Sequence, residues 1–356
     1  MRDALLPSPT RTHMLEEAMS APQCVARLLE QDATTYAALA EHLRLRPAHA
    51  LLTLARGSSD HAAQHLAYLV MARLGRLVTS LPLSIVTLYG ARLPATALQS
   101  FAFSQSGQSP DLVEPTRQLR AAGAGTVALV NDTTSPLAAA AEFVLPLHAG
   151  VERSVAATKS YIAQLVAGAR LVAAWQQDAV LAAAVAALPE ALAAAAALDW
   201  SAAVARLQGA EQLFVIGRGP GLAVAQEAAL KFKETCGMQA EAYSAAEVQH
   251  GPMALVGPGW PVLVLAPRGP AQAGLLELAL RLHAGGAAVL LALPEAQRAL
   301  AEAQGVTTLP LATTGHEDLD AITAVQSFYP MVEALARARG RNPDCPPFLA
   351  KVTRTH

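Results

Sequence analysis

The chain has 356 residues, of which 53% are hydrophobic and only 15% are charged, and its formal net charge is −2. A typical domain has about 150 residues, so this length predicts two domains. The apolar composition excludes a disordered chain, and the lack of a basic excess excludes a dedicated nucleic-acid binder.

Signals for membranes, secretion and metals are also missing from the sequence. The most apolar stretch, residues 179–197, is interrupted by Pro189 and Glu190, so we expect two short buried helices and no membrane span. The N-terminus has no apolar core followed by a cleavage site, and we expect no secretory leader. Three cysteines without paired spacing and ten scattered histidines predict no disulfide framework, no bound metal and a cytoplasmic protein.

Short apolar runs, each followed by a turn and a helical stretch, recur along the first half of the chain. We expect strands at 50–55, 100–103, 126–130 and 143–147, with helices between them. Strands that alternate with helices predict βαβ units in a parallel sheet with helices on both faces. The continuous apolar character of the strands fits a sheet that is covered on both sides.

The same order of elements repeats in the second half. A shift of 162 residues lays segment 50–69 over 212–231 with six identities, which include Arg56 with Arg218 and Gly57 with Gly219. Two further segments match in the same order, 101–108 with 262–269 and 121–130 with 283–292. The predicted organisation is a helical lead-in at 1–45, duplicated α/β domains at 46–190 and 191–340, and a tail at 341–356.

A serine-rich turn, Ser104-Gln-Ser-Gly-Gln-Ser109, follows one expected strand and precedes an expected helix. Backbone N–H groups and the helix dipole favour an anion at such a turn, and the side chains complete a phosphate cage that needs no lysine or arginine. Ser58 and Ser59 add hydroxyls at the end of a neighbouring strand, where ligands bind in open α/β sheets. The alternative is an ordinary turn with Ser109 as helix cap and Pro110 as first helical residue.

The matching turns of the second half, Pro220-Gly221 and Arg268-Gly269, have no serine cluster. We therefore expect one phosphate site per chain, in the first domain.

Glu227, Lys231 and Glu234 are spaced at i, i+4 and i+7, which places them on one face of a helix. The ordinary interpretation is a solvated, salt-bridged face. Charge is scarce in this chain, however, and a carboxylate held beside a lysine can stay ionised and act as a general base in a closed site.

His250 and Lys351 are ambiguous from the residues alone. A histidine before a Gly-Pro turn is commonly structural, and a lysine near a C-terminus commonly lies in solvent. Apolar residues surround Lys351 in PPFLAKVT. We expect them to be buried, so that the tail docks on the protein.

Six segments resemble those of a known family: ARGSSDH, SQSGQSPD, VAATKS, EAALKFKE, AEVQHGP and PPFLAKVT. In this order they resemble the double sugar-isomerase (SIS) domain, and more narrowly the isomerase half of glutamine–fructose-6-phosphate aminotransferase and its stand-alone relatives. The resemblance implies two tandem SIS domains, each a three-layer αβα unit around a parallel sheet, with a C-terminal tail over the active site.

The resemblance also implies roles for individual residues. Phosphate would be bound by Ser59, Ser104, Gln105, Ser106 and Ser109, and the sugar would be lined by Ser58, Val155 and Ala156.

Proton transfer between C1 and C2 would fall to Glu234, with Lys231 assisting and Glu227 as a further site carboxylate. His250 would open the sugar ring in the partner subunit of a homodimer. Lys351 would contact the sugar carbonyl and can form a Schiff base. The resemblance implies no cofactor.

Three departures from the aminotransferase pattern favour the stand-alone relatives. Arg2 stands where the aminotransferase has the catalytic cysteine of its glutaminase domain, so we expect no glutamine hydrolysis. Gln108 replaces a glutamate and Ala157 replaces a serine. We therefore expect an isomerising deaminase that converts glucosamine 6-phosphate and water to fructose 6-phosphate and ammonia.

Three alternatives stay open. The chain could be an ammonia- or partner-dependent glucosamine-6-phosphate synthase, or a deaminase or deglycase for another aminated sugar phosphate. It could also be a sugar-phosphate sensor, which the joint presence of Glu234, His250 and Lys351 disfavours.

Overall fold

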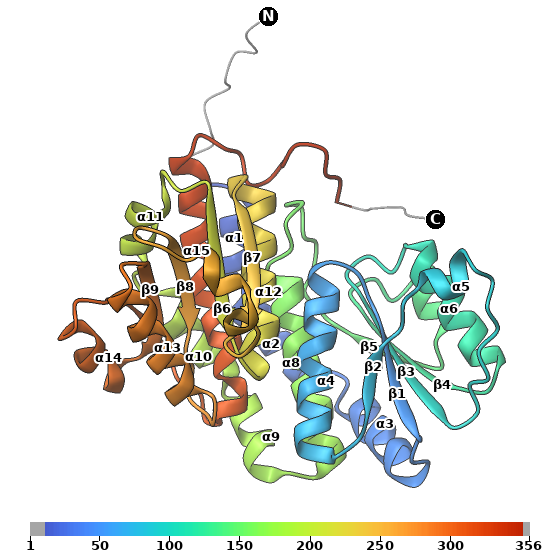
Figure 1. The fold of residues 1–356 in the computed structure, drawn as a ribbon. Helices are drawn as coiled ribbons and strands as arrows, with labels where there is room; N and C mark the ends of the chain where they lie inside the picture. The colour runs from blue at the N-terminus through green and yellow to red at the C-terminus, as the bar shows by residue number, and fades with distance from the viewer. Residues whose placement is uncertain (1–10, 352–356) are drawn as a thin grey trace, which may run out of the picture.

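The computed structural model describes residues 11–351, which contain two parallel sheets of five strands each (Figure 1). The first sheet has the order β2 (Val78–Ser80), β1 (Ala50–Leu54), β3 (Leu98–Ser104), β4 (Gly125–Val130) and β5 (Phe143–Pro146). The second has the order β10 (Thr307–Leu311), β9 (Ala288–Pro294), β8 (Pro261–Leu265), β6 (Gln212–Gly217) and β7 (Gln239–Ser244). Helices flank both sheets, so the predicted fold class is confirmed.

The two sheets share one topology, because β2-β1-β3-β4-β5 corresponds strand for strand to β7-β6-β8-β9-β10. Three pairs of glycines that lie 162 residues apart adopt positive φ: Gly57 and Gly219 (55° and 62°), Gly75 and Gly237 (63° and 60°), and Gly107 and Gly269 (63° and 122°). Few other residues accept this conformation, so the pairs mark equivalent backbone positions. The third pair aligns 101–108 with 263–270, one residue beyond the match made from sequence.

Helices fill the space around the sheets. The lead-in consists of α1 (His13–Met19), α2 (Ala21–Glu30) and α3 (Ala33–Leu45). The first domain contributes α4 (Ser58–Leu74), α5 (Ser84–Thr87), α6 (Pro110–Ala121) and α7 (Pro136–Ala140). Between the two sheets in the chain come α8 (Lys159–Gln176), α9 (Ala179–Ala186), α10 (Leu188–Ala196) and α11 (Ser201–Leu207). The second contributes α12 (Pro220–Lys231), α13 (Gln272–Ala284), α14 (Glu295–Glu302) and α15 (Asp320–Ala338), with short helical turns η1 (Phe232–Cys236), η2 (Glu247–His250), η3 (Pro252–Leu255) and η4 (Glu317–Leu319).

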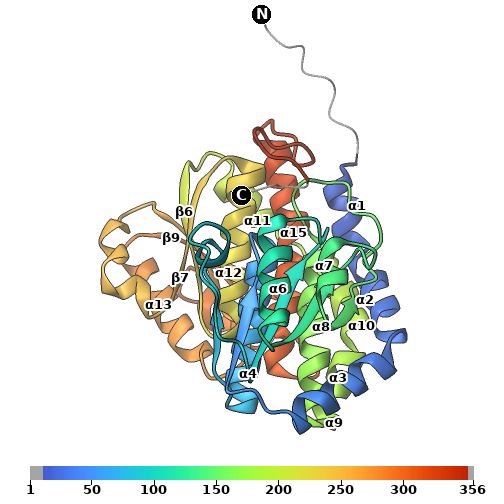
Figure 2. The same cartoon turned by 90° about the vertical axis from the view of Figure 1, so that its right-hand side faces the viewer.

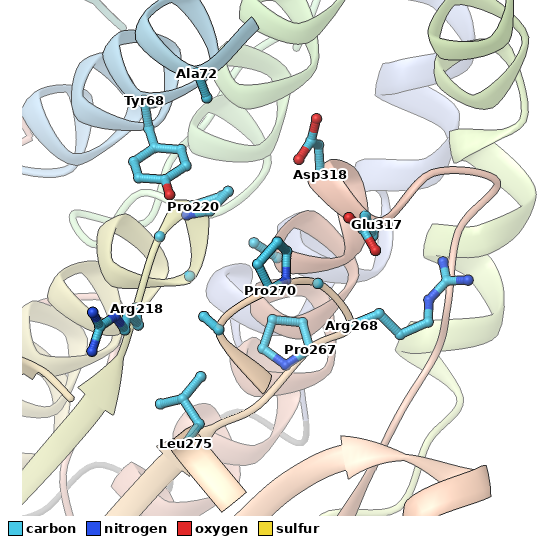
Figure 3. Close-up of a pocket in the computed structure, with 15 residues that line it drawn as sticks. Tyr68, Ala72, Arg218, Pro220, Pro267, Arg268, Pro270, Leu275, Glu317 and Asp318 are labelled. Atoms are coloured by element: carbon cyan, nitrogen blue, oxygen red, sulfur yellow. The ribbon is translucent and has the colours of Figure 1, made fainter. Parts of the chain in front are cut away.

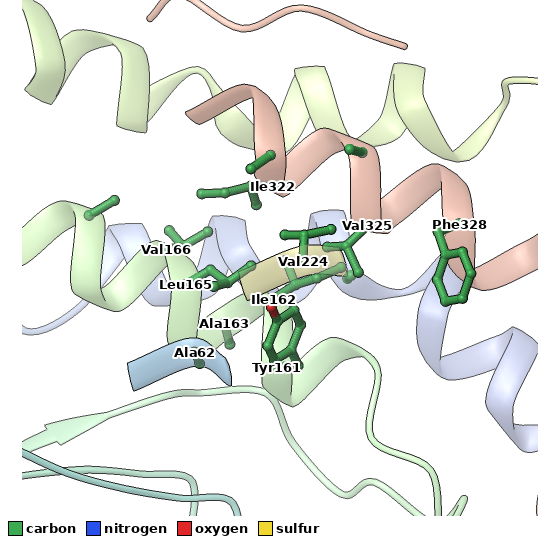
Figure 4. Packing of buried hydrophobic residues seen from close by; sticks show 14 of the residues in the cluster. Ala62, Tyr161, Ile162, Ala163, Leu165, Val166, Val224, Ile322, Val325 and Phe328 are labelled. Atoms are coloured by element: carbon green, nitrogen blue, oxygen red, sulfur yellow. The ribbon is translucent and has the colours of Figure 1, made fainter. Parts of the chain in front are cut away.

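One continuous apolar core joins the two halves. Tyr161 and Ile162 of α8 belong to the same buried cluster as Val224 of α12 and Val325 and Phe328 of α15, and none of them is more than 1% exposed (Figure 4). Burial of each such side chain stabilises the fold by about 1.5–3 kcal/mol. The outer face of each sheet has a smaller cluster of its own. The halves are thus held together through helices, and a site between them has rigid walls.

Helices α9 and α10 cover most of the apolar stretch that the sequence divides at Pro189. Each buries one face only: Leu181 and Leu192 are fully buried, whereas Val180 is 68% exposed. The expectation of two short buried helices therefore holds for one face of each helix only, because the pair lies on the surface of the α8 and α15 core. Among residues 11–351 no single helix is long and apolar enough to cross a membrane. Of the described helices, only this pair, bent by 45°, has the combined length and composition of a membrane span.

The tail leaves α15 and runs towards the first domain (Figures 1 and 2). The expectation that apolar groups pack around Lys351 is wrong, since Phe348 is fully exposed and Leu349 is 47% exposed. Polar contacts hold the tail instead, at Asp344 and at Lys351. Residues 1–10 of the predicted lead-in and 352–356 of the predicted tail lie outside the described residues.

Candidate active site

A cavity of about 360 Å³ opens at the carboxyl ends of β1 and β3. The strand order reverses between these two strands, which is where open α/β sheets bind ligands. Glu234 from the second half and Lys351 from the tail also line the cavity. All five residues predicted to bind phosphate lie on its wall: Ser59, Ser104, Gln105, Ser106 and Ser109.

The serine loop between β3 and α6 keeps its hydroxyl protons available. Ser104 Oγ accepts a hydrogen bond from the Gly107 N–H at 2.9 Å, and Ser106 Oγ accepts one from the Gln108 N–H at 3.3 Å. Ser109 is the N-cap residue of α6, but its hydroxyl makes no capping hydrogen bond. Hydroxyls that accept from their own loop can still donate to an anion. This loop therefore differs from the ordinary capped turn that the sequence left open.

Gly107 fixes the shape of this loop. Its φ is 63°, and a Cβ atom at this position would lie 2.1 Å from Ser135 Oγ. Any other residue would combine a strained backbone with a steric clash.

Lys231 is fully buried and lies between two carboxylates. Its Nζ is 3.3 Å from Glu227 Oε1 and 2.5 Å from Glu234 Oε2, and it donates to Ser58 Oγ at 3.1 Å. Burial disfavours the charged amine, but the two carboxylates outweigh this effect and raise the pKa of Lys231. The i, i+4, i+7 pattern thus forms a buried ionic cluster, and the alternative of a solvated helix face is excluded.

The two carboxylates of this cluster have different surroundings. Glu227 is fully buried, accepts a hydrogen bond from Tyr329 Oη at 3.2 Å and lies 3.1 Å from His61 Nδ1. Burial opposes its ionisation, yet Lys231 and His61 lower the pKa of Glu227 below its ordinary value. The Glu234 side chain is 20% exposed and faces the cavity. Glu234 can therefore exchange a proton with a ligand, whereas Glu227 stabilises the lysine from behind.

Glu234 lies in the π-helical turn η1, which follows α12 directly. Such wide turns are rare and occur frequently at functional sites. No pattern in the sequence indicated this turn or the contact between His61 and Glu227, which lie 166 positions apart.

Glu152, which the sequence analysis missed, is the partner of Lys351. Its Oε2 accepts from Lys351 Nζ at 2.8 Å and from Ser160 Oγ at 2.7 Å, and its Oε1 accepts from the N–H groups of Thr158 and Ser160. Burial opposes ionisation, but Lys351 and these donors at the start of α8 lower the pKa of Glu152. The one usable signal was an acidic residue close before the VAATKS segment.

The loop before α8 reaches the cavity through different residues from those expected. Val155 lines the cavity, but Ala156 is 1% exposed and points into the core, and Ala157 lines the cavity in its place. The assignment of Ala156 to the sugar therefore stays a prediction, whereas Ser58 does line the cavity.

His250 ends η2 in the second half, is exposed, and does not line the cavity of its own chain. Of the other predicted catalytic residues, Glu234 and Lys351 line the cavity, and the buried Lys231 and Glu227 lie behind Glu234.

The second half contains a matching cavity of about 340 Å³ at the ends of β6 and β8 (Figure 3). At the positions equivalent to the phosphate-binding residues it has Gly221, Ala266, Pro267, Arg268 and Ala271. Arg218 lies at its edge and points away from Pro270 (Figure 3). The second cavity therefore offers no serine hydroxyls where the first offers four.

Within the described part of the chain, no cluster of three or more histidine, cysteine or acidic side chains could hold a metal ion. Cys24 and Cys236 are buried and Cys345 is exposed, and all three are free thiols.

Comparison with known proteins agrees with this arrangement. Residues 44–174 and 206–323 match the SIS domain. The chain belongs to the SIS family. The two matched segments of this SIS protein contain the two sheets. Each cavity lies where the strand order of its sheet reverses, between β1 and β3 or between β6 and β8.

A curated relative, the isomerizing glutamine–fructose-6-phosphate aminotransferase of Aeropyrum pernix, is 33% identical over 351 residues, which cover 95% of this chain and 56% of the relative. The SIS chain thus spans about half the length of the curated relatives it matches. It is homologous to their isomerase half.

Among solved structures, a protein assigned as a phosphosugar isomerase from Silicibacter pomeroyi DSS-3 is 44% identical, with a TM-score of 0.88 over 94% of this chain and 100% of its own. The glucosamine-6-phosphate deaminase of Thermotoga maritima has a TM-score of 0.76 at 20% identity, over 97% of this chain and 100% of its own. The latter likeness shows a common fold alone.

Proposed function

We propose that this SIS protein is an isomerising deaminase that converts glucosamine 6-phosphate and water to fructose 6-phosphate and ammonia. One observation carries the proposal: the carboxylate of Glu234, which is paired with the buried Lys231, lines the same cavity as the serine loop. Aldose–ketose conversion requires one base that moves a proton between neighbouring carbons and a firm hold on the phosphate.

The chemical steps follow from this arrangement. The serine loop and Ser59 bind the phosphate, and His250 of a partner subunit opens the pyranose ring. Glu234 then removes the proton from C2 of the open-chain aldehyde and returns a proton to C1. The amine-bearing C2 becomes an imine, and water hydrolyses it to the ketone with release of ammonia.

Lys231 and Lys351 assist Glu234 in different ways. Lys231 Nζ contacts Glu234 Oε2 at 2.5 Å and orients the carboxylate that accepts the proton. Lys351, which Glu152 places on the cavity wall, contacts the sugar carbonyl. These steps need no cofactor.

Gln108 and Ala157 favour deamination over the alternative reactions, since both replace residues of the aminotransferase pattern. An ammonia- or partner-dependent synthase, and a deaminase or deglycase for another aminated sugar phosphate, would use the same cavity. The cytoplasm is the proposed compartment, in keeping with the three free cysteines.

A panel of phosphorylated amino sugars, scored for ammonia release by a coupled assay, tests the proposal. We expect turnover of glucosamine 6-phosphate. Turnover of a different aminated sugar phosphate, without turnover of glucosamine 6-phosphate, would identify the protein as a deaminase or deglycase for that other substrate. Binding without turnover by folded protein would refute the enzyme and favour a sensor.

A homodimer is part of the proposal, because His250 is exposed and does not line the cavity of its own chain. Chains with His250→Ala and chains with Glu234→Gln should each be inactive. When mixed, they should regain partial turnover, since one of the two sites in a mixed dimer has both residues intact. No recovery in proven mixed dimers would contradict the shared site.

A further inference from the structure

Arg56 lies beside the segments that form the phosphate end of the cavity. It precedes Gly57 in the turn after β1, and it lines the cavity together with Ser59 and Ser109. Its Nη2 donates to Asp111 Oδ2 at 3.1 Å, and Asp111 is in the first turn of α6, just after Ser109. The guanidinium is thus fixed within one helical turn of the serine loop.

The ion pair with Asp111 leaves Arg56 able to bind a ligand. A guanidinium carries five N–H donors in a planar fork, and this contact uses one of them. The side chain of Asp111 is 3% exposed, whereas that of Arg56 is 55% exposed. The carboxylate is therefore anchored in the protein, and the cation is at the cavity.

Positively charged side chains are few in the lining of this cavity. A phosphate monoester becomes a dianion above a pH of about 6, and the serine loop offers it neutral donors. The described lining residues include two cations, Arg56 and Lys351, and Lys351 is paired with Glu152. We propose that Arg56 is a phosphate-binding residue that makes the site selective for dianionic phosphate monoesters.

This inference rests on the proposed function for its substrate class, and it differs from the sequence expectation of a phosphate cage that needs no lysine or arginine. Bidentate contacts between a guanidinium and phosphate are among the strong charge-assisted hydrogen bonds. The internal repeat provides a matched control, because Arg218 precedes Gly219 as Arg56 precedes Gly57, and it lines the cavity without serines.

Calorimetric binding of inorganic phosphate to the intact protein at low ionic strength tests the role of Arg56 without any turnover. We expect Arg56→Gln to weaken binding about tenfold at pH 7, and Arg218→Gln to change it less than about twofold. Between pH 5 and pH 7 the affinity of the unmodified protein should rise as phosphate gains its second charge, and the rise should be smaller in Arg56→Gln.

Asp111→Asn separates ligand binding from a structural role of the ion pair. If Arg56 binds phosphate, this variant should bind at least as well as the unmodified protein, because the charge of Arg56 is no longer offset. If the pair is only structural, Asp111→Asn and Arg56→Gln should lose equal affinity, which would overturn the inference. Should Arg56→Gln unfold because the ion pair with the buried Asp111 is lost, the double variant Arg56→Gln/Asp111→Asn replaces it.

The outcomes also separate this inference from the proposed reaction. Phosphate binding that depends on Arg56, without turnover of any amino sugar, would keep the inference and refute the deaminase. Turnover with an unchanged KM and unchanged phosphate affinity in Arg56→Gln would support the deaminase and refute the inference about Arg56.

Discussion

In the first half of the chain the turn after its central strand β3 carries Ser104, Ser106 and Ser109, whereas the equivalent turn after β8 carries Ala266, Arg268 and Ala271. Gly107 and Gly269 occupy equivalent positions in the two turns, and both adopt positive φ. Duplication therefore preserved the cavity and its position, and the side chains alone decide which cavity can hold a phosphate.

Among the helices, the second half and not the first carries the charged site residues. On α12 and η1, Glu227, Lys231 and Glu234 form the ionic cluster, and the equivalent positions of α4 are His65, Leu69 and Ala72. Each cavity takes a wall from the other half, since Glu234 lines the first and Ala72 lines the second. One complete site thus needs the turns of one half and the helix of the other.

The largest effect is expected at Glu234, the residue of the second half that lines the cavity of the first. Glu234→Gln should reduce exchange of the C2 proton with solvent deuterium, followed by NMR, by about a thousandfold, since it removes the general base. Sugar-phosphate binding should persist. Glu317→Gln, in the second cavity, is the control and should leave exchange unchanged. Exchange that persists in Glu234→Gln would mean that another group is the base.

A second prediction concerns His65, the counterpart of Glu227. Burial lowers the pKa of His65 to about 4, and neither ring nitrogen has a hydrogen-bond partner within residues 11–351. The unfolded chain binds this proton near pH 6.5, so the free energy of unfolding should fall by about 3 kcal/mol as the pH drops from 6.5 to 4. His65→Leu should remove this loss, as measured by urea denaturation across that range. If the free energy of unfolding fell equally with pH in both proteins, the buried histidine would not be neutral in the folded state.

A third prediction tests the tail, which lines the first cavity alone. Glu152→Gln removes the charge that holds Lys351, so turnover should fall about tenfold and labelling of Lys351 by an amine-reactive reagent should accelerate. Glu17→Gln is the matched control, because Glu17 is also a buried acid and binds the backbone N–H groups of Arg153 and Ser154 in the same loop. Equal labelling of Lys351 in both variants would show that Glu152 has no particular hold on the tail.

The smallest effect is expected at Ser109. Ser109→Ala removes one neutral donor and should raise the KM for the sugar phosphate about threefold to tenfold, with little change in kcat. The reciprocal change in the other turn, Ala271→Ser, should have no effect on steady-state kinetics. A fall in kcat alone would assign Ser109 to the chemical step and not to phosphate binding.

Local patterns in the sequence predicted much of this molecule. Apolar runs between turns located four of the five strands of the first sheet and missed the short strand β2 (Val78–Ser80). The i, i+4, i+7 spacing predicted the cluster around Lys231. The serine loop was identifiable because its residues are consecutive. In each case the partners lie within a few positions along the chain, and local geometry alone brings them together.

Contacts between distant segments could not be predicted in this way. Glu152 and Lys351 are 199 positions apart, and Arg56 and Asp111 are 55 apart. The apolar letters of PPFLAKVT suggested a buried tail, but polar anchors at its two ends leave Phe348 in solvent. The side-chain direction of Ala156 depends on the course of a loop, which composition does not encode.

Asp344 connects three parts of the molecule that are remote in sequence. Its carboxylate accepts hydrogen bonds from the N–H groups of His13 and Met14 at 2.9 and 2.8 Å, and its carbonyl accepts one from the N–H of Val155 at 3.1 Å. Helix α1 is therefore clamped by the same residue that steadies the wall of the sugar site. A fusion partner or antibody fragment that pulls on α1 would transmit its strain to the chemistry while leaving every reacting side chain untouched.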